Sequence, residues 1–109
     1  MTSVKVVKQN GSIAEVTCDG HTGYGVEGED IVCAALSSIV QTAMLGVLSI
    51  AGVNMQFERR DEDGYLRFVI PKDISKEQRA ICDNILDTML LGVADLNQGF
   101  SDFIELEVQ

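Results

Sequence analysis

The chain has 109 residues, the length of one ordinary domain, and its 8 basic and 17 acidic side chains give a net charge of −9. This acidity argues against direct binding to nucleic acid or to an anionic membrane surface, and it favours a basic partner. Three cysteines cannot all pair within one chain, and no secretory leader is recognisable before the first predicted strand. We therefore expect a single domain over residues 1–109, with reduced thiols and a cytoplasmic location.

The first residues predict an antiparallel hairpin. Two runs rich in β-branched side chains, 4–8 and 12–18, flank the dipeptide Asn10-Gly11. Asparagine followed by glycine tolerates the positive φ angles of a two-residue turn, so the two runs are expected to pair directly.

A long helix is predicted next, with Asp30 as its N-cap and its end near Ala51. No charged side chain occurs from Ile31 to Phe57, so the segment meets the length criterion for a membrane span. Serine, threonine and glutamine residues interrupt it, and Gly52 is expected to end the helix, which favours a buried core helix instead. Apolar or small residues lie nearly all round this helix, so we expect a self-association surface and a homodimer.

The second half predicts another hairpin, a second helix and a closing strand. Apolar and polar residues alternate over 53–58 and 65–70, on either side of the acidic turn 61–64, and again over 104–108. Ser75 and Gln78 form a capping box for a helix that ends near Asn97. Its apolar stripe is expected to hold Ile81, Ile85, Thr88, Met89 and Gly92. The order ββαββαβ predicts a two-layer α+β domain, with a mostly antiparallel sheet and both helices on one face.

The candidate chemistry lies where the glycine-rich segment after the first hairpin meets the predicted helix. His21, the one histidine of the chain, stands there, and Cys33 falls at the third predicted helical position. A thiol is mostly protonated at neutral pH, and both a neighbouring imidazolium and the first turn of a helix favour the thiolate. Unpaired N–H groups at a helix start, including that of Cys33, also suit an oxyanion. The pair predicts a cysteine nucleophile and its base, the alternative being a surface histidine and a small buried cysteine.

Other residues near this pair have two interpretations each. Asp30 is expected to cap the helix, with orientation of His21 as the alternative. Ser37 lies one turn beyond Cys33, so its hydroxyl either lines a pocket or bonds back to a helix carbonyl. Glycines that leave the segment without packing side chains suggest a flap over a substrate, or an ordinary surface loop. These glycines are Gly20, Gly23, Gly25 and Gly28.

A zinc site is the rival interpretation of the same residues. Cys18 and His21 form one short chelating pair, and Cys33 and Cys82 are the remaining candidate ligands of a Cys₃His site. A structural zinc site commonly has two such pairs, and Cys82 falls inside the second predicted helix, where a buried thiol is expected. The glycine spacing also matches neither the dinucleotide fingerprint nor a phosphate-binding loop. We therefore expect no metal and no other cofactor.

The run Gly20-His21-Thr22-Gly23-Tyr24, followed by GEDIVCAA over 28–35 and then Ser37, resembles the signature of the ribosomal-processing cysteine protease (Prp) family of Firmicutes and related bacteria. The resemblance extends over nearly the full length. In this frame His21 matches the family histidine and Cys33 the family nucleophile, while Asp30 and Ser37 match further motif positions.

The resemblance implies a cytoplasmic, homodimeric endopeptidase. Its substrate would be a large-subunit ribosomal protein of the bL27 type, from which it removes an N-terminal extension by cutting after a phenylalanine in a short apolar motif. Such a substrate is basic, which suits this acidic chain. A Cys-His dyad is the simplest mechanism, because the sequence does not require a third member. The alternative function is a non-catalytic dimeric factor for ribosome assembly or ribosomal-protein binding.

Overall fold

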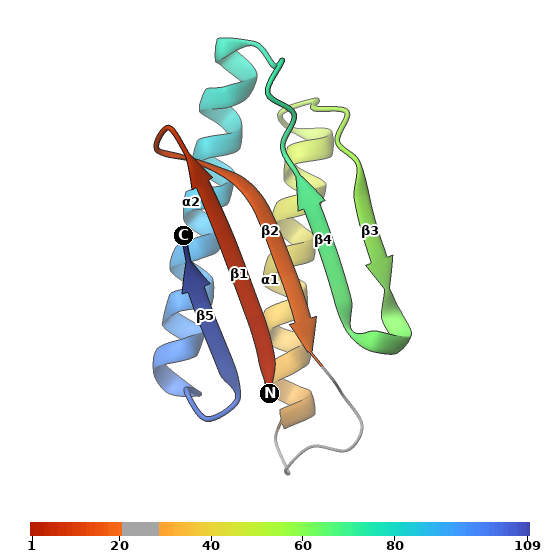
Figure 1. Cartoon of the computed structure of the whole chain (residues 1–109), viewed down its shortest axis with the longest axis vertical. Helices are drawn as coiled ribbons and strands as arrows, with labels where there is room; N and C mark the ends of the chain where they lie inside the picture. The colour runs from red at the N-terminus through yellow and green to blue at the C-terminus, as the bar shows by residue number, and fades with distance from the viewer. Residues whose placement is uncertain (21–28) are drawn as a thin grey trace.

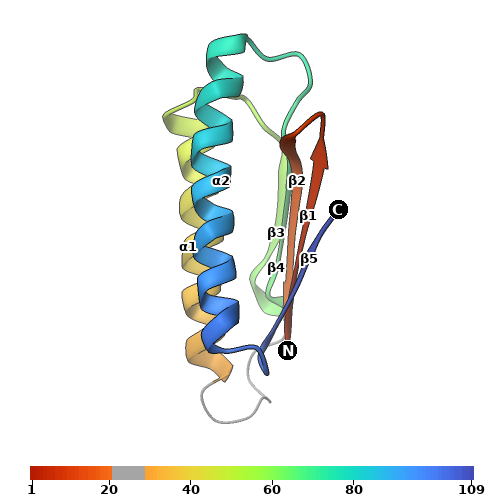
Figure 2. The same cartoon turned by 90° about the vertical axis from the view of Figure 1, so that its left-hand side faces the viewer.

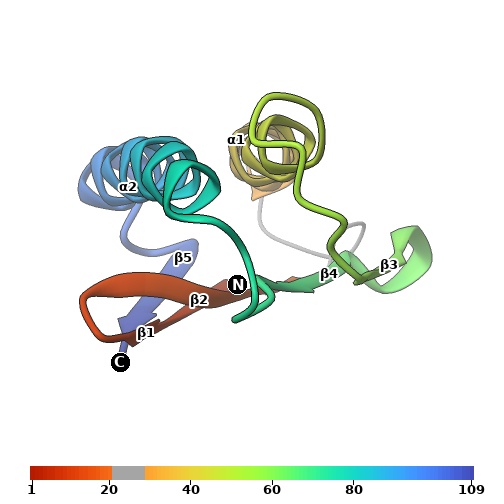
Figure 3. The same ribbon diagram turned by 90° about the horizontal axis from the view of Figure 1, so that it is seen from above.

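The fold is a five-stranded sheet with two helices on one face. The computed structural model describes residues 1–20 and 29–109 (Figure 1). In chain order the elements are β1 (Thr2–Gln9), β2 (Ser12–Gly20), α1 (Glu29–Ser49), β3 (Phe57–Arg60), a short 3₁₀ turn (Asp61–Asp63), β4 (Tyr65–Val69), α2 (Lys76–Gly99) and β5 (Ile104–Val108). The strand order is β3-β4-β2-β1-β5. Figure 2 and Figure 3 show both helices on the same side of this sheet, so the predicted two-layer α+β class and element order are confirmed.

Three of the four strand pairings are antiparallel, and β5 pairs parallel to β1. The first hairpin turns through Asn10 and Gly11, both with positive φ, while Gln9 pairs with Ser12. This is the two-residue turn that the sequence predicts.

The second hairpin is less regular than predicted. In β4, Leu66 and Phe68 are buried as expected. The partner strand β3 is only Phe57–Arg60. Val53 and Met55 are buried, but they precede β3 in irregular structure. Phe57 is 49% exposed, because β3 is one of the two edge strands of the sheet. The prediction of one apolar face along 53–58 is therefore wrong beyond Met55.

Helix α1 begins at Glu29, two residues before the predicted first position, so the assignment of Asp30 as N-cap is wrong and Cys33 is the fifth helical residue. The helix ends at Ser49, and the Val53 N–H donates to the Val47 carbonyl at 3.1 Å just past Gly52, which has a φ of +66°.

Residues Ile31–Ser49, with a mean hydropathy of 2.0, are long and apolar enough to cross a membrane by length and composition. In this fold the helix packs on the sheet, with its core-facing side chains fully buried, as the sequence interpretation expects.

Helix α2 starts with the predicted capping box. The Gln78 N–H donates to the Ser75 hydroxyl, and the Ser75 N–H donates to the Gln78 side chain, both at 3.0 Å. The stripe buried against the core is Cys82, Leu86, Met89 and Val93. It shares only Met89 with the predicted stripe, because α2 has a second apolar side that faces α1. There Ile85 packs near Gly46, and Gly92 packs near Ile39.

Candidate active site

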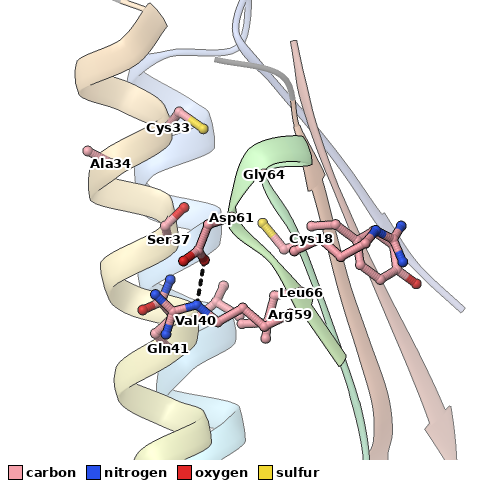
Figure 4. Close-up of a pocket in the computed structure, with 12 residues that line it drawn as sticks. Cys18, Cys33, Ala34, Ser37, Val40, Gln41, Arg59, Asp61, Gly64 and Leu66 are labelled. Carbon is pink, nitrogen blue, oxygen red and sulfur yellow. Dashed lines mark hydrogen bonds and ion pairs between the residues drawn. The ribbon is translucent and has the colours of Figure 1, made fainter. Parts of the chain in front are cut away.

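A cavity of about 320 Å³ separates the N-terminal half of α1 from the β3–β4 hairpin (Figure 4). Cys18 on β2 also lines it. Its lining residues are Cys18, Cys33, Ala34, Ser37, Val40, Gln41, Arg59, Arg60, Asp61, Gly64, Tyr65 and Leu66. The cavity thus joins parts of the chain that lie far apart in sequence, and one of them carries the predicted nucleophile.

Helix α1 supplies one wall of this cavity. With 3.6 residues per turn, Cys33, Ser37 and Gln41 follow one another on a single face of the helix. Figure 4 shows the side chains of Cys33 and Ser37 on the same side of α1, toward the cavity. The prediction that Ser37 shares a face with Cys33 is confirmed, and its hydroxyl is available to the cavity.

The hairpin supplies the opposite wall, which sequence analysis did not predict. Arg59 Nε donates to Asp61 Oδ1 at 2.6 Å, and both side chains are exposed at the mouth. Gly64, the residue before β4, has a φ of +64°, and a Cβ added there would overlap the Gly20 carbonyl oxygen. The Gly20 N–H also donates to the Gly64 carbonyl at 3.1 Å. This contact fixes the turn of the hairpin against the end of β2.

Cys33 has a neighbour that sequence analysis missed. The hydroxyl of Thr2, at the start of β1, donates to Cys33 Sγ with an O···S distance of 3.5 Å. Cys33 itself is only 4% exposed, so its sulfur is reached through the cavity. The two residues are 31 positions apart in the sequence, and nothing about a threonine at position 2 indicates this contact.

The other two cysteines are unsuited to nucleophilic chemistry. Burial, with smaller contributions from the charges of Cys33 and Asp19, raises the pKa of the Cys18 thiol to about 12, so this thiol stays protonated at neutral pH. Cys82 is fully buried on the core side of α2, as predicted, and does not line the cavity. Burial raises the pKa of its thiol, an effect that Arg79 opposes and Asp83 reinforces. Cys33 remains the candidate nucleophile among the three cysteines.

Comparison with known proteins agrees with this geometry. The family model described as cysteine protease Prp matches residues 1–105. The chain belongs to the Prp family of cysteine proteases. A ribosomal processing cysteine protease Prp of Bacillus subtilis is 24% identical over 83 residues, which are 76% of this chain and 74% of that protein.

Two crystal structures of the essential ribosomal processing protease Prp from S. aureus share the fold. One, in complex with a substrate peptide, has a TM-score of 0.87 at 21% identity. The other, in complex with a covalently linked product peptide, has a TM-score of 0.82 at 23% identity. Both matches cover 100% of each chain. The layout of sheet and helices in this chain is therefore that of Prp structures.

Several predicted elements of the Prp motif lie outside the described residues. These are His21 and the flap glycines Gly23, Gly25 and Gly28. Gly20 is described, and it is the buried last residue of β2 rather than part of a loop, so its assignment to the flap is corrected. Asp30 is the second residue of α1.

The observed helix start changes one mechanistic expectation. An α-helix leaves its first four N–H groups without intrahelical partners. Cys33 is the fifth residue of α1, so its N–H reaches the carbonyl one turn earlier and is not among the unpaired groups. The expectation that this N–H binds an oxyanion is therefore wrong for this chain.

The zinc interpretation finds no support in the part of the chain that the structure describes. Within residues 1–20 and 29–109 no three His, Cys, Asp or Glu side chains gather closely enough to hold a metal ion. Cys82, which the zinc site would need, lies on the core side of α2 and away from the cavity that Cys18 and Cys33 line.

Proposed function

We propose that this Prp-family protease removes the N-terminal extension of a ribosomal protein of the bL27 type, with Cys33 as nucleophile and His21 as base. The observation that carries the proposal is the position of Cys33 on the wall of a cavity that separates α1 from the β3–β4 hairpin. The names of the Bacillus subtilis and S. aureus relatives, which describe ribosomal processing, support the class of substrate.

The proposed reaction has two steps. Cys33 Sγ, as the thiolate, attacks the carbonyl carbon of the scissile peptide, and the imidazolium of His21 protonates the leaving amine. This step forms a thioester between Cys33 and the extension and releases the mature protein. Water activated by His21 then hydrolyses the thioester, which returns the thiolate and releases the extension as a carboxylate.

The walls of the cavity suit the expected residue before the cut. Val40 and Leu66 are buried apolar residues of its lining and form an apolar floor in this proposal, whereas the side chains of Arg59 and Asp61 are exposed. We assign the phenylalanine side chain of the substrate to this floor, since an aromatic ring gains most from an apolar surface. The net charge of −9 favours approach of a basic ribosomal protein.

The experiment is mass spectrometry of the extended ribosomal protein after incubation with this chain. We expect a single cut after the phenylalanine, and we expect replacement of that phenylalanine by aspartate in the substrate to abolish it. Cys33→Ala and His21→Ala should both lose the cut. Binding of the substrate without a cut by the unmodified chain would favour the alternative of a non-catalytic ribosomal-protein-binding factor.

We also assign this protease to the cytoplasm, where its substrate is made, and to a homodimer. The dimer is supported by large apolar side chains that are exposed on the helices or next to them, among them Leu45, Ile50 and Leu91. Met44 and Met89, by contrast, belong to the core of the protomer. Sedimentation of the unmodified chain should give the mass of two protomers, and Ile50→Glu should shift it toward one; a monomer at micromolar concentration would contradict this assignment.

A further inference from the structure

Thr2 is unusual among the described residues, since it is the one polar side chain that is buried, with 1% of its surface exposed. A buried hydroxyl needs a hydrogen-bond acceptor, because it has lost its partners in water. The acceptor that the structure gives it is Cys33 Sγ, at 3.5 Å. A threonine of the first strand therefore contacts the nucleophile of the proposed reaction.

Its surroundings hold this threonine in place on three sides. The Thr2 N–H donates to the Phe103 carbonyl at 2.8 Å, and Thr2 pairs with Ile104 on one side and with Gly20 on the other. Its side chain fills the space that a Cβ on Gly20 would occupy. The absence of a side chain at Gly20 thus makes room for the threonine.

The hydrogen bond depends on the charge of the sulfur. A neutral thiol sulfur is a weak acceptor, whereas hydrogen bonds to ionised acceptors are roughly twice as strong as neutral ones. The hydroxyl of Thr2 is therefore better satisfied when Cys33 is a thiolate. It also directs the sulfur to one position on the cavity wall, where attack on a peptide begins.

We infer that Thr2 is a positioning residue for the nucleophile: its hydroxyl holds Cys33 Sγ at the cavity wall and stabilises the thiolate over the thiol. This inference rests on the proposed role of Cys33 as nucleophile, and it is independent of the identity of the substrate.

The test is the pH dependence of the reaction of Cys33 with dithiodipyridine, a small neutral disulfide, in the whole protein, with the labelled cysteine identified by mass spectrometry. Thr2→Val keeps the shape of the side chain and removes the hydroxyl, whereas Thr2→Ser keeps the hydroxyl. Thr17→Val is the matched control, because Thr17 lies on the neighbouring strand β2 and outside the cavity. All variants are compared at equal folded fraction.

The expected result is a change in the shape of the pH profile. Loss of a charge-assisted hydrogen bond should lower the thiolate fraction about tenfold at neutral pH, which moves the profile up by about one pH unit. A more basic thiolate is also about threefold more nucleophilic, so Thr2→Val should react about threefold more slowly at neutral pH and as fast or faster at high pH. Thr2→Ser and Thr17→Val should follow the unmodified protein.

Four results would overturn the inference. An unshifted profile in Thr2→Val would show that the hydroxyl does not favour the thiolate, and an equal loss of rate at every pH would indicate only structural damage. A profile of Thr2→Ser that differs from that of the unmodified protein would show that the hydroxyl alone does not account for the effect. If Cys33 of the unmodified protein reacts no faster than Cys18, the assignment of the nucleophile fails as well. The reagent replaces the substrate, so an error in the proposed ribosomal substrate leaves this test unaffected.

Discussion

Replacement of Gly64 by alanine should destabilise the fold more than the same replacement at Gly52. Both glycines have a positive φ, of +64° and +66° respectively, so an alanine at either position bears about 1–2 kcal/mol of backbone strain. At Gly52 nothing lies within 4 Å of an added Cβ, whereas at Gly64 the methyl group would overlap the Gly20 carbonyl oxygen. The two variants therefore share the strain and differ only in the steric clash.

The clash should cost a further 1–3 kcal/mol or so, as overpacking of a tight contact does. The smaller conformational entropy of an unfolded chain with alanine offsets both losses by about 0.4–1 kcal/mol. We expect Gly52→Ala to lose about 1 kcal/mol and Gly64→Ala about 2–4 kcal/mol of unfolding free energy. Both values come from urea titrations monitored by circular dichroism.

Activity gives a second readout of the same pair. Gly64 holds the hairpin wall of the cavity against Gly20, the residue that precedes His21 in the chain, so its replacement should also displace the cavity wall. Gly64→Ala should lose peptide cleavage under conditions where it is still folded, and Gly52→Ala should keep it. Equal losses of stability in the two variants would refute the steric argument, and full activity of folded Gly64→Ala would refute the role of the contact.

Three further predictions concern single interactions. Ser75→Ala should lose about 1 kcal/mol of unfolding free energy in urea titrations, since it removes the capping box of α2, and it should leave kcat/KM unchanged. An unfolding free energy equal to that of the unmodified chain would contradict the stabilising role of the cap. Burial raises the pKa of the Cys18 thiol to about 12, whereas the unfolded thiol titrates near 9. Below pH 9 the thiol is protonated in both states and its contribution to the unfolding free energy is complete. As the pH rises from 9 toward 12, only the unfolded thiol ionises, so the unfolding free energy falls by about 1 kcal/mol per pH unit. The unfolding free energy of the unmodified chain should therefore decline more steeply over this range than that of Cys18→Ala, and parallel curves would contradict the burial argument. Arg59→Ala should change stability by less than about 1 kcal/mol, because its ion pair is exposed, but it should raise KM for the substrate. Arg67→Ala is the control: it breaks a similar pair with Glu15 outside the cavity and should leave KM unchanged. Equal KM values for the two variants would remove Arg59 from the binding surface.

The parts of the fold that sequence predicts well depend on neighbouring residues. The turn at Asn10-Gly11 and the capping box of Ser75 and Gln78 are both local signals, and both are confirmed. The start of α1 was misplaced by two residues, because an aspartate inside the first turn of a helix has the same sequence appearance as one that caps it.

The parts that sequence could not predict depend on tertiary contacts. Phe57 fits the alternation of a half-buried strand, yet it is exposed because β3 forms the edge of the sheet. The buried stripe of α2 was shifted because the helix packs on the sheet and on α1 with different sides. In the site, Cys33 and Ser37 share a helix and were predicted together. Thr2 and the hairpin wall join them only through the folding of distant segments.

The most direct test of Cys33 as the nucleophile is the rate of cleavage of the extended ribosomal protein by Cys33→Ala and Cys18→Ala, measured beside the unmodified chain. The two cysteines line the same cavity, and burial raises the pKa of the Cys18 thiol to about 12, so the comparison separates the proposed nucleophile from a neighbouring thiol. We predict that Cys33→Ala loses more than about a thousandfold in kcat, while Cys18→Ala stays within about threefold of the unmodified chain at equal folded fraction. Cleavage that persists in folded Cys33→Ala, or that disappears in folded Cys18→Ala alone, would contradict the account.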